Sequence, residues 1–592
     1  MAYDPESTPA RPLLALASPQ HGHRRRSAWT LARRPRVLLL VGALALLAFS
    51  AATAFFGPPL DIPVPKFRFG HGHEDGGYVD NPPPPPHDSG DSPGRHPRPP
   101  PSPAPLDAEL PPSVNADNYT APALAAVAAL RAAQPALAAA RARYTLKTGR
   151  PPPRGFDAFV AFAQERNCLV DAYAGVHADF APFWALERQE KGWFRRRVEG
   201  LEKQLLAAPR GMIALRVHAG AVHKPDYWGS YFDDDWRAKI GQFAAHLPDL
   251  TVVINGRDEP RVVFDVAPLL ESSLDSDSTL PLDPDSDSAQ MTKITELTAL
   301  HDATPFALAP PSTASFFASK PGCGGPGGGA VSFLRSSSSA EFTTDLYPVL
   351  SMAKIRDVSS GNANANSAHT CFADVLVPGE FYYRNSWWAG KFAHPDNVPW
   401  GSKVERLYWR GKSNGGHIRG ANYRAFPRFR LMDIARRPQH ADLFDVRITS
   451  WHESHCTDEC DAAPIVAAYN ITGEVVPREE AYRFKYLLDV DGNTFSGRYL
   501  GLLRSGGLVF KSTAFTEFFT PWLVPYEHYI PVRPDLADLV EKVEWARAND
   551  GEARRIQESG RVFAEHVLTD AQNDCYWFAV LLEWGALWGE GA

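Results

Sequence analysis

The order of apolar and polar residues divides most of the chain into helix-like and strand-like stretches. Residues 155–207 place apolar and aromatic side chains three and four positions apart, which is the repeat of an amphipathic helix. Residues 212–220 and 250–256 are short apolar runs of the kind found in buried strands. Beyond residue 400, apolar runs alternate with helical repeats along RLYWRG, FRLMDIARR, FDVRITS, KYLLDV and GLVFKS. We therefore expect two α/β domains, of which the second is doubly wound.

Three further stretches depart from these repeats. Residues 269–290 are rich in aspartate and serine, and residues 320–329 are rich in glycine, so both predict surface loops. Residues 121–145 are good helix formers interrupted by Pro135, which predicts two short helices or one kinked helix.

The first 120 residues contain a candidate membrane anchor and a stem. Residues 37–57 carry no charge, and as a helix they reach about 30 Å, enough to span a bilayer. Arginines cluster before this run, so the positive-inside rule places residues 1–36 in the cytosol and the rest of the chain in the lumen. Residues 58–120 are dense in proline and predict a disordered stem. A cleaved signal peptide is the alternative, because small residues close the apolar run.

Further sequence features bear on the disulfides, the glycosylation and the partners of the protein. Cys456 and Cys460 are close enough to form a disulfide, but free thiols or a zinc site with neighbouring histidines are the alternatives. The sequons predict N-glycosylation at Asn118 and Asn470. A net charge of −7 with no basic domain argues against nucleic acid as a partner.

Two segments after residue 400 carry candidate chemistry. Residues 485–512 predict strand, turn, helix and strand, with Arg498 at the start of the helix, where an anion would sit in an open α/β sheet. Residues 408–430 predict a strand, a basic glycine-bearing loop and a helix. Guanidinium groups and backbone N–H groups in such a loop suit a diphosphate. The alternative is a structural unit with solvated arginines.

Taken together, WRGKSNGG, the arginines after it, residues 485–512 and EFFTPWLVPYEHYIPV (517–532) resemble the glycosyltransferase family 90 domain. That family includes fungal capsule-associated xylosyltransferases and Rumi-type protein O-glucosyltransferases. The resemblance runs from about residue 249 to residue 588. It implies a GT-B fold of two Rossmann-like domains, an acceptor-side domain at 121–400 and a nucleotide-sugar domain at 401–592.

The resemblance also implies roles for individual residues. In the first domain, VVINGRDEP (252–260) looks like the family's strand followed by Arg-Asp, so Asp258 is the candidate general base. A loop aspartate paired with Arg257 is the alternative. Glu517 sits where GT-B enzymes often place a carboxylate on ribose. The complete set of candidate UDP-sugar ligands is Arg410, Gly411, Lys412, Ser413, Arg424, Arg498 and Glu517.

Metal dependence is a separate question. Residues 233–235 and the pair Asp489 and Asp491 resemble the DxD motif that holds a divalent cation in GT-A transferases. A GT-B site can use arginines and helix dipoles instead. We therefore expect no required cofactor, with Mn²⁺ as the alternative, and no protein-bound metal. A calcium loop starting at Asp489 is excluded, because Thr494 and Leu500 replace the required glycine and glutamate.

The resemblance implies an inverting glycosyltransferase that moves xylose or glucose from a UDP-sugar to a hydroxyl of a glycan or glycoprotein. One N-terminal helix would anchor it as a single-pass type II protein of the Golgi membrane, in preference to the endoplasmic reticulum. The alternative is a membrane-anchored glycan-binding or scaffold protein that keeps the fold without turnover.

Overall fold

The computed structural model describes residues 119–264, 266, 307–308, 341–343, 345–355, 372–384, 398–456 and 460–590. The predicted anchor, most of the predicted stem, the two low-complexity stretches and Asn118 lie outside these residues. Within the described part of the chain, no single helix is long and apolar enough to cross a membrane, although the bent pair α2 and α3 passes that test by length and composition.

Helices fill the first described segment, as its repeat predicts. They are α2 (Thr120–Ala132), α3 (Leu137–Thr148), α4 (Phe156–Glu165), α5 (Ala174–Gln189) and α6 (Trp193–Ala207). Pro135 lies in the break between α2 and α3, whose axes differ by 83°. In α4 the buried residues are Phe156, Phe159, Val160 and Ala163, which share one helical face.

The first sheet is mixed. Its strand order is β2-β1-β3-β6-β8, with β1 (Met212–His218), β2 (Ala221–His223), β3 (Leu250–Asn255), β6 (Leu350–Ser351) and β8 (Val375–Leu376). The two predicted strands, β1 and β3, lie side by side, but they run antiparallel, with Met212 opposite Asn255. The neighbouring pairs β3–β6 and β6–β8 are parallel, whereas β1 pairs antiparallel with both of its neighbours. Helix α7 (Asp233–Gly241) follows β2, and β4 (Ala307–Leu308) pairs with β5 (Glu341–Phe342) separately.

The second sheet is parallel throughout, as the alternation after residue 400 predicts. Its order is β10-β9-β11-β12-β14, with β9 (Val404–Lys412), β10 (Phe444–Ser450), β11 (Phe484–Val490), β12 (Leu508–Ser512) and β14 (Ile530–Val532). The accompanying helices are α12 (Pro427–Ala435), α13 (Ala462–Tyr469), α14 (Tyr499–Leu503), α15 (Leu539–Ala548) and α16 (Asp550–His566). Every residue of β11 and β12 is buried, which is typical of central parallel strands.

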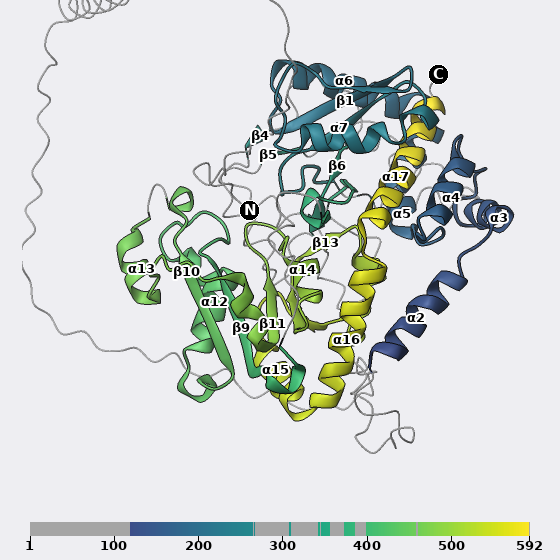
Figure 1. The fold of residues 1–592 in the computed structure, drawn as a ribbon. Coiled ribbons are helices and arrows are strands. Elements are labelled where there is room, and N and C mark those ends of the chain that lie inside the picture. Colours follow the sequence, from purple (N-terminus) through teal and green to yellow (C-terminus); the bar gives the residue numbers. More distant parts are fainter. Residues whose placement is uncertain are drawn as a thin grey trace, which may run out of the picture. The chain divides into compact units, whose positions relative to one another are not determined.

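The chain crosses back between the sheets in two places. Strand β13 (Phe515–Glu517) leaves the second sheet and pairs with β7 (Ala353–Ile355). Helix α17 (Asp570–Glu590) packs on α4, α5 and α6, and Figure 1 shows it running beside α5. Trp584 donates from Nε1 to the carbonyl of Thr251 on β3 at 2.9 Å. Residue 400 therefore separates the two sheets, whereas α17 completes the core of the first.

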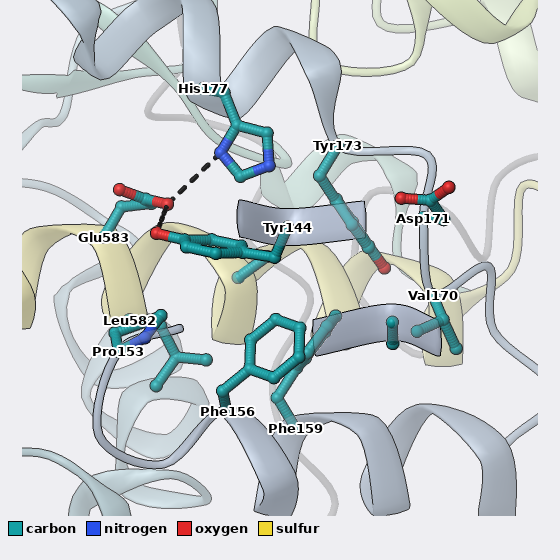
Figure 2. Close-up of a pocket in the computed structure, with 12 residues that line it drawn as sticks. Tyr144, Pro153, Phe156, Phe159, Val170, Asp171, Tyr173, His177, Leu582 and Glu583 are labelled. Carbon is teal, nitrogen blue, oxygen red and sulfur yellow. Dashed lines mark hydrogen bonds and ion pairs between the residues drawn. The ribbon is translucent and has the colours of Figure 1, made fainter. Parts of the chain in front are cut away.

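Buried polar contacts and a disulfide hold α17 in place. Cys575 is bonded to Cys168, and Glu583 accepts hydrogen bonds from the Tyr144 hydroxyl at 2.6 Å and from Arg150 at 2.9 Å. Figure 2 shows Tyr144 and His177 converging on this carboxylate in a cavity of about 30 Å³. Burial raises the pKa of Glu583, but its partners outweigh that effect and hold the pKa below the ordinary value. The cavity has room for water rather than for a sugar.

A second disulfide joins Cys456 and Cys460. Of the alternatives kept open for this pair, the structure therefore contains the disulfide. It lies beyond β10, close to the loop that follows β9, where Ile418 bridges to Cys456.

Candidate functional site

The carboxyl ends of β9 and β11 border a pocket of about 250 Å³. Three guanidinium groups line it, from Arg410 on β9, Arg498 before α14 and Arg478 on the segment that precedes β11. No carboxylate occurs among the described residues that line this pocket. The remaining walls are aromatic and aliphatic, including Tyr408 and Leu487. A pocket of this composition favours an anion with an apolar or aromatic portion.

Arg498 has a buried guanidinium nitrogen that is left without a hydrogen-bond partner among the described residues. Its Nη1 donates to the carbonyl of Arg410 at 2.8 Å, and its Nη2 is buried without a hydrogen-bond partner among the described residues. Burial lowers the pKa of Arg498, while the charge of Asp489 opposes that effect. The group stays cationic, because an arginine pKa lies far above neutrality. An unsatisfied buried cation is costly, so this position favours an anionic ligand.

Arg410 is held more firmly. Its Nη1 donates to the carbonyl of Asp445 at 2.7 Å, and its Nη2 lies 2.5 Å from the Asp445 carboxylate. Its guanidinium stacks on Tyr408, 4.5 Å from the ring centroid. Asp445 therefore positions Arg410 across the sheet, and a phosphate there would share this guanidinium with the carboxylate.

A fourth arginine, Arg428, was not singled out from the sequence. It donates from Nε to the carbonyl of Asp491 at 3.0 Å and from Nη1 to that of Lys412 at 2.9 Å, joining the loops after β11 and β9. Burial lowers its pKa to about 9, and the nearby charge of Arg498 adds to this. The signal for it was present, because Arg428 shares a helical face of α12 with Leu431 and Met432, which are both buried.

The side chain of Trp409, two positions earlier on the same face of β9, explains why position 411 holds a glycine. A Cβ at Gly411 would lie 2.6 Å from Cζ2 of Trp409. The Trp409 ring in turn lies beneath two guanidinium groups, 5.4 Å from that of Arg428 and 5.8 Å from that of Arg498. Glycine at this position therefore lets an aromatic ring support both arginines.

We expect Gly411→Ala to destabilise the protein by about 1–3 kcal/mol, since the Trp409 ring must move to admit the methyl group. The measurement is the urea midpoint of unfolding. Gly401→Ala is the matched control, because a Cβ there would meet nothing within 4 Å. Equal midpoints for the two variants would show that the Trp409 ring moves aside without a loss of stability.

The other predicted ligands on this domain lie in different surroundings. Ser413 is buried, and its Oγ accepts from the backbone N–H of His452 at 2.9 Å. Lys412 is exposed at the end of β9, and Arg424 is exposed on the turn 422–425, outside the pocket lining. The structure thus brings together Arg410, Gly411 and Arg498, with Ser413 in the adjoining loop.

Glu517 lies in a buried charged cluster. Its carboxylate is fully buried, accepts a hydrogen bond from Tyr382, and lies 3.6 Å from Nζ of Lys511. Lys511 also pairs with Asp489 at 3.0 Å. Burial raises the pKa of Glu517 to about 7, although the Lys511 charge and the Tyr382 hydrogen bond lower it. A ribose contact from this carboxylate stays a prediction.

Asp258 lies on the other sheet, in the half-buried turn that follows β3. Asn255 fixes this turn, because its side chain accepts from the N–H of Arg257 at 3.0 Å and donates to the carbonyl of Glu259 at 2.7 Å. Asn255 is fully buried and was not predicted as part of a site. The turn therefore holds the Asp258 backbone in one geometry, as a positioned base requires.

The two acidic motifs considered for metal binding have other contacts. Asp233 accepts from the N–H of Gly229 at 2.9 Å, and Asp234 pairs with Lys224 at 3.1 Å. Asp491 accepts from the N–H of Ala514 at 2.8 Å. Across the described ranges, no group of three or more histidines, cysteines or carboxylates is placed to hold a metal ion.

Comparison with known proteins confirms the resemblance in the second half of the chain. Residues 393–589 match the family described as Glycosyl transferase family 90. Human protein O-glucosyltransferase 3 is 28% identical over 184 residues, which are 31% of this chain and 32% of that protein. Zebrafish protein O-glucosyltransferase 2 is 29% identical over 190 residues, 32% of this chain and 34% of that protein.

Human protein O-glucosyltransferase 1 is 38% identical over a shorter stretch of 103 residues, 17% of this chain and 26% of that protein. The matched part of the chain thus spans about a third or less of these relatives. The family match includes Arg410, Arg428, Arg498 and Glu517, and it leaves Asp258 outside its bounds.

Proposed function

We propose that this chain, whose residues 393–589 match glycosyltransferase family 90, transfers a sugar from a UDP-sugar to a hydroxyl group with inversion. Xylose or glucose is the proposed sugar, and the acceptor is a hydroxyl of a glycan or glycoprotein. The observation that carries this proposal is the buried, unsatisfied Nη2 of Arg498 in a pocket with two further guanidinium groups.

The pocket supplies what a nucleotide diphosphate needs. Arg498 and Arg410 would contact the phosphates, and Arg428 would hold the loops after β9 and β11 around them. Negative charge grows on the diphosphate as the sugar leaves, and fixed cations in a low-dielectric pocket stabilise that charge. The apolar wall beside Tyr408 and Leu487 suits the remainder of the nucleotide.

Asp258 supplies the second requirement, a base for the acceptor. Its carboxylate would take the proton of the acceptor hydroxyl as the hydroxyl oxygen bonds to the anomeric carbon. The bond from that carbon to the diphosphate breaks on the opposite face, so one displacement inverts the configuration. UDP leaves with the electron pair of the broken bond.

We expect Arg498→Ala to weaken UDP binding by about 1.5–3 kcal/mol, roughly a 10- to 150-fold rise in Kd, as for the loss of a charged hydrogen bond. Isothermal titration of the full-length chain measures this. Arg437→Ala, which removes an exposed arginine of the same domain, is the control and should bind UDP as the wild type does. An unchanged Kd for Arg498→Ala would remove Arg498 from the donor site.

The donor and the metal requirement are tested together. The full-length chain is titrated with UDP, UDP-xylose and UDP-glucose, with Mn²⁺ and with EDTA, and then assayed for sugar transfer. Turnover of only one donor identifies the transferred sugar. Activity in EDTA indicates that the arginines, without a metal ion, stabilise the negative charge on the leaving diphosphate. UDP binding without turnover of any donor favours the inactive glycan-binding or scaffold alternative. No UDP binding at millimolar concentration overturns the proposal.

The proposed setting is the lumen of the Golgi, with residues 37–57 as a type II anchor. The disulfides Cys168–Cys575 and Cys456–Cys460 support it, because such bonds persist in oxidising compartments. Asn470 is exposed and caps α13 in a left-handed conformation, so an N-linked glycan there would project from the surface. Glycosidase treatment of the protein from secretory membranes tests both assignments.

A further inference from the structure

Two aromatic side chains project into solvent beside the turn that carries Asp258. Trp228 is 61% exposed and Tyr231 is 57% exposed. Their rings lie 5.1 Å apart with an interplanar angle of 77°. Large aromatic side chains usually gain from burial, so an exposed pair in contact is a candidate for a ligand-binding surface.

The loop that carries this pair is firmly anchored. Tyr227 accepts a hydrogen bond at its hydroxyl from the N–H of Ala214 on β1 at 2.9 Å. Gly229 lies so close to β1 that an added Cβ would be 2.6 Å from the carbonyl oxygen of Met212. Both neighbours of Trp228 are therefore anchored to β1, which limits the backbone ordering that binding would require.

The same loop contacts the turn of the candidate base. The Ser230 hydroxyl lies 3.5 Å from the carbonyl of Gly256, and an added Cβ at Gly256 would lie 2.3 Å from that of Ser230. Gly256 precedes Asp258 by two residues. Ser230 lies between the two aromatic residues in sequence, so the pair and the base come from loops in direct contact.

Resting on the proposed function, we propose that Trp228 and Tyr231 form an acceptor subsite that binds a pyranose ring, and hence that the acceptor is a saccharide. Sugar rings have an apolar face of C–H groups, which packs on an aromatic face, and a rim of hydroxyls. Asp226 is exposed on the same loop and offers a carboxylate to that rim. Of two rings at nearly a right angle, one can stack on the apolar face of a pyranose while the other borders its edge. An extended polypeptide would instead need a strand edge or side-chain pockets.

The test measures saccharide binding without donor, so that it does not depend on turnover. Immobilised oligosaccharides of mannose, xylose, glucose and galactose are screened with the full-length protein, and the best-bound trisaccharide is then titrated by saturation-transfer NMR. Trp228→Ala and Tyr231→Ala should each raise its Kd at least tenfold. Tyr231→Phe keeps the ring and should bind within about twofold of the wild type.

Two controls separate this inference from the proposed function. Tyr526→Ala removes an exposed aromatic of the second domain and should leave saccharide binding unchanged, and every variant should keep the wild-type Kd for UDP. A wild-type protein that binds UDP but no saccharide, or a Trp228→Ala variant with the wild-type saccharide Kd, overturns the inference and favours a polypeptide acceptor. Failure to bind UDP counts against the proposed function alone.

Discussion

Asp258→Asn should lower the rate of sugar transfer by at least a hundredfold and leave the affinity for UDP unchanged. Asparagine has the size of aspartate but cannot accept the acceptor's proton, and general-base catalysis typically contributes about 10²–10⁴ in rate. The turn should persist in the variant, since the Asn255 side chain is hydrogen-bonded to the backbone of Arg257 and Glu259, on either side of position 258. Single-turnover transfer with saturating donor, together with UDP titration, separates the two quantities.

Glu259→Gln is the matched control for this experiment. It removes a carboxylate from the next residue of the same half-buried turn, while the Glu259 carbonyl that Asn255 binds remains. We expect it to transfer sugar at a rate within a few-fold of the wild type. Wild-type activity in Asp258→Asn would exclude Asp258 as the base.

Lys511→Met should reduce the free energy of unfolding by about 3–5 kcal/mol, the usual cost of removing one partner of a buried ion pair. Lys511 lies beside two fully buried carboxyl groups, Asp489 at 3.0 Å and Glu517 at 3.6 Å. Methionine keeps the length of the side chain, so the lost charge dominates the effect. Urea unfolding of the full chain measures it, with Lys224→Met as the control: this variant breaks an exposed ion pair with Asp234 and should change stability by no more than about 1 kcal/mol.

The pH dependence of the stability lost in Lys511→Met shows whether the lost charge or altered packing causes it. Burial raises the pKa of Glu517 to about 7 from an ordinary value of 4.5, and removing the Lys511 charge raises it further. The unfolded chain ionises Glu517 above pH 4.5, so the wild type loses stability as the pH rises from about 4.5 to about 7. The variant continues to lose stability above pH 7, because its folded form still holds the proton. The difference from the wild type should thus be larger at pH 8 than at pH 5. A difference that is constant with pH would assign the effect to packing.

Local patterns predicted strands β9, β10, β11 and β12 of the second sheet, but not the short strand β14. The corresponding apolar runs became strands, and the parallel arrangement followed because helical stretches separate those runs. Arg410 and Arg498 line one pocket for the same reason, since Arg410 lies near the end of β9 and Arg498 follows β11, the strand next to it.

Long-range features of the fold could not be predicted from the sequence. The repeats before β1 and β3 do not reveal that the two strands run antiparallel, because about thirty residues with a helix between them allow either direction. Helix α17 looked like part of the second domain by its position, yet its tryptophans pack in the first. Asn255 contacts a backbone N–H group and a backbone carbonyl, and no residue pattern predicts such contacts.

The return of α17 to the first sheet sets the time at which this protein can fold during synthesis. Cys168 is separated from Cys575 by 407 residues, and Trp577 and Trp584 complete the core around α4, α5 and β3. At elongation rates of about 5–20 residues per second, the first half waits roughly 20–80 seconds for these residues. Its apolar surfaces remain uncovered in that interval, so chaperones that bind the nascent chain should decide how much of this protein is recovered.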